Sequence, residues 1–260
     1  MKLKRLFAVV IAMLLVLAGC SNSNDNNESK KDDADNGKKQ EIQVAAAASL
    51  TDVTKKLASE FKKEHKNADI KFNCGGSGAL RKQIESGAPV DVFMSANTKD
   101  VDVLKDKNKA HDTYKYAKNS LVLIGDKDSN YTSVKDLKDN DKLALGEVKT
   151  VPAGKYAKQY LDNNNLFKEV ESKIVYAKDV KQVLNYVEKG NAKQGFVYKT
   201  DLYKQNKKID TVKVIKEVEL KKPITYEAGA TSDSKLAKEW MEFLKSDKAK
   251  EILKEYHFAA

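Results

Sequence analysis

This chain is poor in the residues that build disulfide frameworks and metal sites, and it lacks a long apolar run. Its 260 residues include only two cysteines and three histidines. With Cys20 in the N-terminal processing region, Cys74 is left alone and no disulfide framework can form. The histidines (His65, His111 and His257) have no metal-ligand spacing. These shortages argue against a disulfide-stapled domain and against direct metal ligation.

Nucleotide and hydrolase motifs are also missing or incomplete. The glycines near Lys82 do not form the G-x-x-x-x-G-K-[ST] phosphate loop. Residues 75–79 (GGSGA) come close to the nucleophile elbow G-x-S-x-G but end in alanine. A serine hydrolase would also need a histidine base, and neither His111 in its charged loop nor His257 has a motif around it. An enzyme is therefore a minor alternative, and no cofactor is expected.

The N-terminal residues have the pattern of a secretory signal. Three basic residues precede an apolar run at residues 6–18, which is short for a bilayer span. Residues 17–20 (LAGC) resemble a bacterial lipobox, so we expect residues 1–19 to be removed and Cys20 to be lipidated. Residues 20–40 are almost all polar and predict a disordered tether with a reach of roughly 25 Å. The remaining 220 or so residues suit one large domain or two lobes.

The charge is basic but dispersed. The formal net charge is +10, and +7 remains without the three basic residues of the signal. The lysines are scattered among acidic residues, a distribution typical of a solvated surface near an anionic cell envelope. Nucleic acid is not an expected partner.

Four short apolar segments each stop where an amphipathic helix begins. The four openings are Ser49, Ser77, the turn at residues 151–153 and the pair Asp179 and Val180. Ser49 and Asp52 have the form of a capping box, Pro152 fits the first helical position, and Asp179 is an expected N-cap. A helix N-terminus offers unpaired N–H groups and a partial positive charge, so each opening could hold an anion.

The alternation of strands and helices predicts an α/β fold with mostly parallel strands. Ligands of such sheets lie beyond the carboxyl ends of the strands. All four openings lie at that edge, and so does Tyr198, at the end of an expected strand at residues 195–198. Taken singly, each residue is more often an ordinary cap or a half-buried aromatic. Their convergence would create a cage of donors without a cationic side chain.

At these openings the sequence resembles the molybdate-binding proteins of ABC importers. The matching segments occur in the family's order between residues 42 and 258: residues 45–50 (AAAASL), 75–78 (GGSG), 83–89 (QIESGAP), 91–96 (DVFMSA), 151–158 (VPAGKYAK), 177–180 (AKDV) and 195–198 (GFVY). The resemblance implies a two-lobed, type II periplasmic-binding-protein fold with mixed, mainly parallel sheets and a hinge of two crossovers.

The resemblance also implies five ligand-binding residues. Ser49 and Ser77 would donate hydroxyl groups, Ala153 and Val180 backbone N–H groups, and Tyr198 its phenolic hydroxyl. Gly76 and Gly78 depart from relatives that have serines there, which would loosen the loop or remove an auxiliary donor.

The expected organisation follows from the same resemblance. Residues 41–121 with 227–260 would form the first lobe and residues 122–226 the second, with crossovers near Leu121 and Tyr226. The expected partners are the ABC permease, its ATPase and the membrane reached through lipidated Cys20, on the extracytoplasmic side. The protein is expected to be a monomer.

The donor set selects a class of ligand. Molybdate is an unprotonated dianion with only acceptor oxygens, whereas phosphate keeps a proton near neutral pH and favours a site that includes an acceptor. Tungstate shares molybdate's chemistry, and sulfate, also a dianion, stays open as the alternative ligand, because donor chemistry does not separate it from molybdate. A structural or adhesive surface lipoprotein is the remaining class.

Overall fold

The computed structural model describes residues 39–260. The expected signal at residues 1–19, the lipidation site Cys20 and the tether as far as residue 38 lie outside the described residues. No helix among residues 39–260 combines the length and the apolar character needed to cross a membrane.

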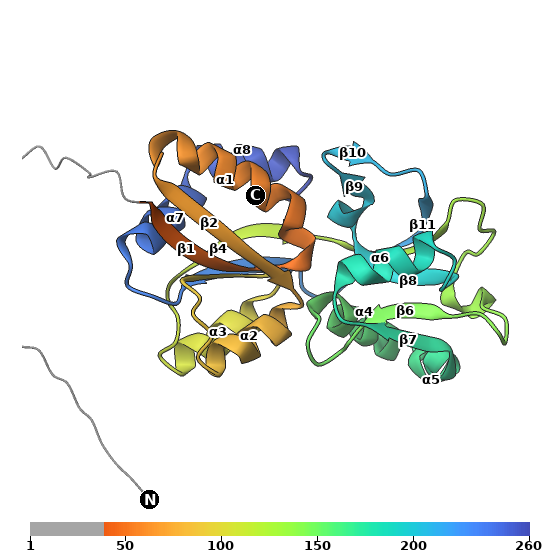
Figure 1. The fold of residues 1–260 in the computed structure, drawn as a ribbon. Coiled ribbons are helices and arrows are strands. Elements are labelled where there is room, and N and C mark those ends of the chain that lie inside the picture. Colours follow the sequence, from red (N-terminus) through yellow and green to blue (C-terminus); the bar gives the residue numbers. More distant parts are fainter. Residues whose placement is uncertain (1–38) are drawn as a thin grey trace, which may run out of the picture. The chain divides into compact units, whose positions relative to one another are not determined.

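Two five-stranded sheets form the two lobes of an α/β fold (Figure 1). In the first lobe the strand order is β2-β1-β3-β12-β4. The strands are β1 (Gln40–Ala47), β2 (Ala68–Gly75), β3 (Val92–Ser95), β4 (His111–Asn119) and β12 (Ile224–Ala230). β1 pairs with β2 and β3 in parallel, whereas β12 pairs with β3 and β4 in antiparallel. This sheet is therefore evenly mixed rather than mainly parallel.

The second sheet repeats the arrangement of the first. Its order is β11-β5-β8-β6-β7, with β5 (Leu121–Asp126), β6 (Leu143–Gly146), β7 (Ile174–Ala177), β8 (Gln194–Tyr198) and β11 (Val212–Val218). β6 pairs with β7 and β8 in parallel, and β5 pairs with β8 and β11 in antiparallel. Each lobe thus has three parallel strands whose carboxyl ends can present a ligand site.

Helices cover both faces of the first sheet. Helix α1 (Thr51–Glu64) lies with α7 (Lys235–Lys245) and α8 (Asp247–Glu255) on one face, while α2 (Ser77–Glu85) and α3 (Thr98–Asp106) lie on the other (Figure 1). The apolar stripe of α1 packs on α7 through Phe61 and Trp240, whose ring centroids are 5.2 Å apart in a T-shaped contact. Because both faces are covered, the small apolar residues of β1 are buried throughout its C-terminal half.

The second sheet is also covered on both faces. Gly195 of β8 faces Val183 and Val187 of α6 (Val180–Glu188). The next residue, Phe196, faces Tyr160 of α4 (Pro152–Asn163) at 5.9 Å between ring centroids. Since consecutive strand residues point to opposite faces, α6 and α4 cover opposite sides. The smaller elements are α5 (Phe167–Val170), β9 (Tyr203–Lys204), β10 (Lys207–Lys208) and four 3-10 segments at Ala48–Leu50, Val134–Asp136, Glu171–Lys173 and Lys199–Leu202.

The chain crosses between the lobes twice, at adjacent places. It leaves the first sheet after Asn119 and enters the second at Leu121, and it returns between Val218 and Ile224. Asn119 pairs with Ile224 and Leu121 with Val218, so the two crossovers run side by side. Tyr226, near which the return was expected, lies inside β12 of the first lobe.

Besides the two-residue strands β9 and β10, the edge strand β4 was not predicted from the sequence. His111 begins β4 and is not part of a charged loop. Among its nine residues (HDTYKYAKN), only Tyr116 and Ala117 are buried. An edge strand with so little apolar alternation gives almost no periodic signal.

Candidate functional site

All five sequence-predicted donors line one cavity between the lobes. The first lobe contributes Ser49 and Ser77, and the second contributes Ala153, Val180 and Tyr198. The other lining residues are Ala47, Ala48, Gly75, Gly76, Ala96, Val151 and Pro152. The cavity therefore lies beyond the carboxyl ends of the parallel strands of both sheets.

Ser49 reaches the cavity from the turn that follows β1, but it is not a helix cap. It lies inside the 3-10 turn Ala48–Leu50, and helix α1 begins after Leu50 without a side-chain cap. Its Oγ instead lies 2.9 Å from the hydroxyl of Tyr226. The predicted capping box of Ser49 and Asp52 is therefore wrong, because the serine side chain turns toward Tyr226 of β12 rather than toward its own helix.

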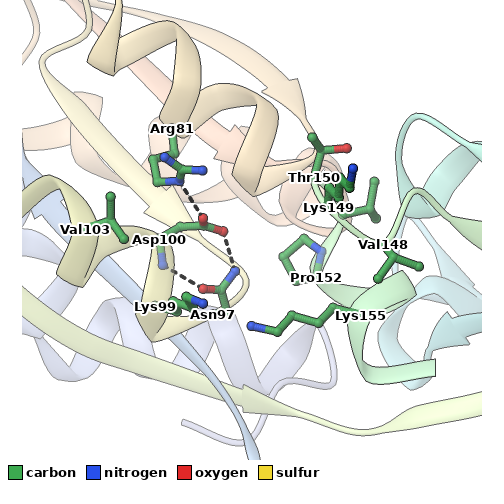
Figure 2. Close-up of a pocket in the computed structure, with 11 residues that line it drawn as sticks. Arg81, Asn97, Lys99, Asp100, Val103, Val148, Lys149, Thr150, Pro152 and Lys155 are labelled. Carbon is green, nitrogen blue, oxygen red and sulfur yellow. Dashed lines mark hydrogen bonds and ion pairs between the residues drawn. The ribbon is translucent and has the colours of Figure 1, made fainter. Parts of the chain in front are cut away.

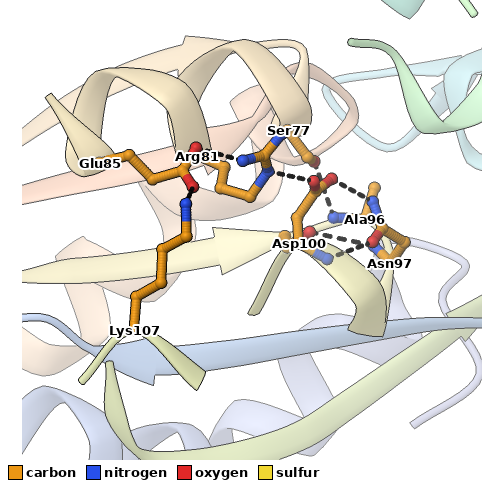
Figure 3. A network of polar contacts seen from close by, with 8 residues as sticks. Ser77, Arg81, Glu85, Ala96, Asn97, Asp100 and Lys107 are labelled. Carbon is orange, nitrogen blue, oxygen red and sulfur yellow. Dashed lines mark hydrogen bonds and ion pairs between the residues drawn. The ribbon is translucent and has the colours of Figure 1, made fainter. Parts of the chain in front are cut away.

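Ser77 is the first residue of α2, and Gly76 is the N-cap. Its side chain is fully buried, and its Oγ accepts a hydrogen bond from the backbone N–H of Ala96 at 3.0 Å. Behind it, Asn97 caps α3 by accepting from the N–H of Asp100 at 2.8 Å (Figure 3). Asp100 also accepts from Arg81 of α2 at 2.8 Å, which ties α2 to α3. This network fixes the position of the serine.

Two helix N-termini of the second lobe supply backbone donors. Pro152 and Ala153 are the first two residues of α4, and Val180 is the first residue of α6. N–H groups in the first turn have no acceptor in their own helix. Asp179 is the N-cap of α6, as expected, and its carboxylate accepts from the N–H of Gln182 at 2.9 Å. That carboxylate is thus committed to its own helix.

Tyr198 ends β8 with its side chain buried at the cavity wall. Its hydroxyl is buried, makes no hydrogen bond of ordinary geometry among the described residues and lies near the hydroxyl of Tyr226. Burial raises the pKa of Tyr198 well above its ordinary value, so the hydroxyl keeps its proton and remains a donor. A buried hydroxyl that donates to no acceptor destabilises the folded protein unless a ligand accepts its hydrogen bond.

A carboxylate that the sequence did not reveal lies behind Tyr198. Asp201 is 1 % exposed and accepts the N–H of Tyr198 at 3.0 Å. Lys181 lies 3.3 Å from Asp201 and 3.9 Å from Asp52 of the first lobe. Burial raises the pKa of Asp201 despite the nearby lysine. Asp201 does not line the cavity, so its charge acts from behind the site.

Gly76 and Gly78 allow the lobes to touch. The N–H of Gly78 donates to the carbonyl of Thr150 at 2.9 Å. A Cβ at Gly76 would lie 2.8 Å from the oxygen of Thr150, and one at Gly78 would lie 2.9 Å from its Cα. Serines at these positions would therefore hold the two backbones apart. Loosening of the loop or loss of an auxiliary donor stays a prediction, and the structure adds that these glycines make a close contact across the cleft.

The cavity is small and uncharged. Its volume is about 10 Å³, the room of about one water molecule. Every side chain in its lining is neutral, and three of the lining groups are hydroxyls, of Ser49, Ser77 and Tyr198. Among residues 39–260, no group of three or more His, Cys, Asp or Glu residues is arranged to hold a metal ion. The arrangement can donate hydrogen bonds to a compact acceptor.

Cys74, the lone cysteine of the described chain, lies beside the site without joining it. It is half-buried and packs against the core. Burial raises the pKa of its thiol, so the reactive thiolate is disfavoured. This agrees with its interpretation as a small apolar residue.

Comparison with known proteins places the chain among relatives of similar length. YvgL of Bacillus subtilis, a candidate ABC transporter substrate-binding lipoprotein, is 38 % identical over 98 % of this chain and 97 % of its own. The molybdate-binding protein ModA of Escherichia coli is 36 % identical over 86 % of this chain and 90 % of its own. The solved substrate-binding domain of a candidate molybdenum ABC transporter from Clostridium difficile is 40 % identical, with a TM-score of 0.63 and coverage of 84 % and 98 %.

The two-lobed α/β architecture and the similarity to molybdate-binding proteins are confirmed by these matches. The sequence profile described as "Bacterial extracellular solute-binding protein" matches residues 42–259. This chain belongs to the bacterial extracellular solute-binding protein family.

Proposed function

We propose that this protein is the extracytoplasmic receptor of an ABC importer and binds molybdate, together with tungstate, between its two lobes. One observation carries the proposal: the five expected donors line a single uncharged cavity, and one of them, Tyr198, has a buried hydroxyl that makes no hydrogen bond of ordinary geometry among the described residues. The molybdate-binding and molybdenum-transport relatives support the choice of ion. Ser49, Ser77, Ala153, Val180 and Tyr198 are the proposed ligand-binding residues.

The chemistry of the cavity suits an unprotonated oxyanion. Two helix N-termini of the second lobe and that of α2 point their partial positive charges at the same space. Backbone N–H groups are fixed by the fold and need no side-chain ordering on binding, which preorganises the cage. No carboxylate in the lining would repel a dianion. The small volume excludes amino acids and sugars.

Binding is coupled to the separation of the lobes. Donors from both lobes share one ligand, so the ligand favours the conformation in which the lobes touch. The ion enters when the lobes part, and the closed form is the one presented to the permease. The partners are the ABC permease and its ATPase, and lipidated Cys20 would hold the receptor at the membrane as a monomer. No cofactor and no covalent step are required.

A thermal-unfolding titration with molybdate, tungstate, sulfate and phosphate tests the proposal, with sodium chloride at matched ionic strength as the control. A ligand that binds only the folded state at a thousandfold excess over its Kd stabilises it by about 4 kcal/mol. We expect stabilisation by molybdate and tungstate and a smaller shift with sulfate. The absence of a shift with both ions would exclude the proposal, and a larger shift with sulfate would transfer the function to that ion.

A further inference from the structure

The amide of Asn119 has a fixed orientation at the first crossover. Its Oδ1 accepts the N–H of Ser120 at 2.9 Å. Its Nδ2 lies 2.8 Å from Oγ1 of Thr200 in the second lobe and 3.2 Å from the hydroxyl of Tyr226 in the first. A flipped amide would set its NH2 group against the N–H of Ser120, so the observed orientation is the one that satisfies every group. Because an amide nitrogen only donates, Tyr226 accepts from Asn119.

This orientation determines how Tyr226 meets Ser49. The Tyr226 hydroxyl has one hydrogen, and its remaining partner of good hydrogen-bond geometry is Oγ of Ser49, at 2.9 Å. Burial raises the pKa of Tyr226, so the hydrogen is retained. We therefore assign Tyr226 as the donor and Ser49 as the acceptor of this hydrogen bond. The hydrogen of Ser49 is left for another acceptor, and Ser49 lines the cavity.

Ser77 is held in the same way by a different donor, the N–H of Ala96. Both serines thus accept hydrogen bonds from inside the protein and face the cavity as donors. A free hydroxyl can rotate and accept a hydrogen bond from the OH group of a ligand such as hydrogen phosphate. A hydroxyl that already accepts a hydrogen bond on its protein side would leave its own hydrogen without an acceptor if it also accepted from the ligand.

We propose that Tyr226, held by Asn119, is a positioning residue that fixes Ser49 as a donor and thereby selects acceptor-only dianions over protonated oxyanions. This inference rests on the proposed function. It adds Tyr226 of β12 to the residues that determine ligand binding. Through Thr200, the same amide also connects the serine to the second lobe.

The test compares Tyr226→Phe with Tyr116→Phe by isothermal titration calorimetry at pH 7. Tyr116 is a matched control because its ring is also buried, lies 6.2 Å from that of Tyr226, and has its hydroxyl on the carbonyl of Ser95 outside the cavity. We expect Tyr226→Phe to weaken molybdate binding about tenfold and to narrow the affinity ratio of molybdate to hydrogen phosphate. Tyr116→Phe should change neither. An unchanged affinity and ratio in Tyr226→Phe would overturn the inference.

A double variant separates positioning from general destabilisation. If Tyr226 acts through Ser49, adding Tyr226→Phe to Ser49→Ala should cause no further loss of affinity. Fully additive losses would refute the positioning role while leaving the proposed function intact. Failure of the wild-type protein to bind any oxyanion would instead contradict the proposed function.

A larger cavity adjoins the inner cavity that the five proposed ligand-binding residues line. It has a volume of about 250 Å³, takes residues from both lobes and shares Val151 and Pro152 with the inner cavity (Figure 2). Its basic residues are Arg81 and Lys99 of the first lobe and Lys149 and Lys155 of the second. Arg81 is paired with Asp100 and Glu85. The three lysines are exposed and make no ion pair among the described residues.

We also propose that this basic cavity is an outer capture site for the oxyanion. The inner cavity has only neutral donors, whose attraction is short-ranged. Three unpaired lysines in a cleft raise the local concentration of anions and speed their association. Such exposed charges act on the association rate much more than on the dissociation rate. This inference likewise rests on the proposed function, and it divides capture and retention between two adjacent cavities.

Stopped-flow fluorescence with molybdate tests the capture site. The variant combines Lys99→Gln, Lys149→Gln and Lys155→Gln. Its control combines Lys66→Gln, Lys213→Gln and Lys216→Gln, three exposed lysines outside the cavity, so the net charge is identical. At low ionic strength we expect the association rate to fall about tenfold in the first variant and little in the control. The difference should disappear near 1 M salt.

The alternatives give different kinetics. An equal fall in both variants would assign the effect to the field of the whole protein. A change confined to the dissociation rate would mean that the lysines stabilise the bound complex instead of capturing the ion. Either result would overturn the capture site. Absence of any molybdate association in the wild type would count against the proposed function itself.

Discussion

The two lobes have the same sheet order but offer different donors to the shared cavity. β1 and β2 of the first lobe correspond to β6 and β7 of the second, each at the parallel side of its sheet. After β1 and β2 the chain presents the hydroxyls of Ser49 and Ser77. After β6 and β7 it presents the backbone of Ala153 and Val180, whose side chains are buried in the core.

The two lobes thus direct their hydrogen-bond donors toward the cavity in two different ways. A hydroxyl can rotate, so the first lobe needs partners such as Tyr226 and the N–H of Ala96 to direct it. A backbone N–H at a helix start is directed by the helix itself, so the second lobe is free to use apolar residues there. Variants that change the donors or contacts of one lobe and leave those of the other intact can separate the contributions of the two lobes to binding.

The largest effect is expected where the lobes touch. Gly76→Ala and Gly78→Ala, combined, should weaken molybdate binding at least about thirtyfold, because each added methyl would overpack against the backbone of Thr150 at a cost of about 1–3 kcal/mol. Gly76 has φ −64°, which any residue adopts, so the requirement is space and not conformation. Calorimetry measures the affinity, and denaturant unfolding without ligand should show a much smaller change, since parting of the lobes relieves the clash.

Gly75→Ala is the matched control for this pair. A Cβ there would contact only Leu80 at ordinary distances of 3.7 Å and 3.8 Å. If Gly75→Ala weakens binding as much as the double variant, the effect comes from the loop itself and close approach of the lobes is not the cause.

A smaller effect is expected from removing one backbone donor of the second lobe. Val180→Pro deletes the N–H at the first position of α6, which proline favours. Asp179 before it is already extended, at φ −157° and ψ 170°, as a residue preceding proline requires. A hydrogen bond to a charged ligand contributes about 1.5–3 kcal/mol, so the Kd for molybdate should rise roughly ten- to hundredfold in calorimetry.

Val180→Ala serves as the comparison for this proline variant. It keeps the N–H and removes only buried methyl groups, so it should lower the free energy of unfolding with little change in affinity. Equal loss of affinity in the alanine and proline variants would contradict the assignment of Val180 as a backbone donor.

The contrast between the lobes also explains how much the sequence could reveal. The strand-to-helix junctions follow from local patterns, and the structure brings residues of all four junctions to one cavity. The role of Pro152 and the cap at Asp179 are local too, and both are confirmed. The backbone donors of the second lobe were therefore the more predictable half.

The parts that were missed depend on residues far apart in the chain. Ser49 looks like a cap in sequence, but its partner Tyr226 is 177 residues away. Asn119 and Asp201 occupy no motif, and their importance comes from the crossover and from burial. The closeness of Gly76 to Thr150 likewise exists only when the two lobes meet. Long-range contacts of this kind have no periodicity to read.

The smallest effect concerns the charge that the second lobe buries behind Tyr198. Because burial raises the pKa of Asp201 in the folded state, the native protein holds this proton more tightly than the unfolded chain. The associated stability is fully present below the ordinary value of 3.8 and is lost as pH rises through the folded pKa. The free energy of unfolding of the wild type should thus decline relative to that of Asp201→Asn as pH rises above 3.8, in denaturant titrations at each pH.

The asparagine keeps an acceptor for the N–H of Tyr198 and removes only the charge. Other carboxylates whose pKa is lowered, such as Asp136 with its bonds to Thr132 and Ser133, act in the opposite direction but equally in both proteins. Asp52→Asn removes the other carboxylate near Lys181, on the first lobe, and should not reproduce the pH-dependent difference. Parallel stability profiles for the wild type and Asp201→Asn would mean that Lys181 fully offsets the burial of Asp201. The lobes would then differ in their donors but not in the charge held behind them.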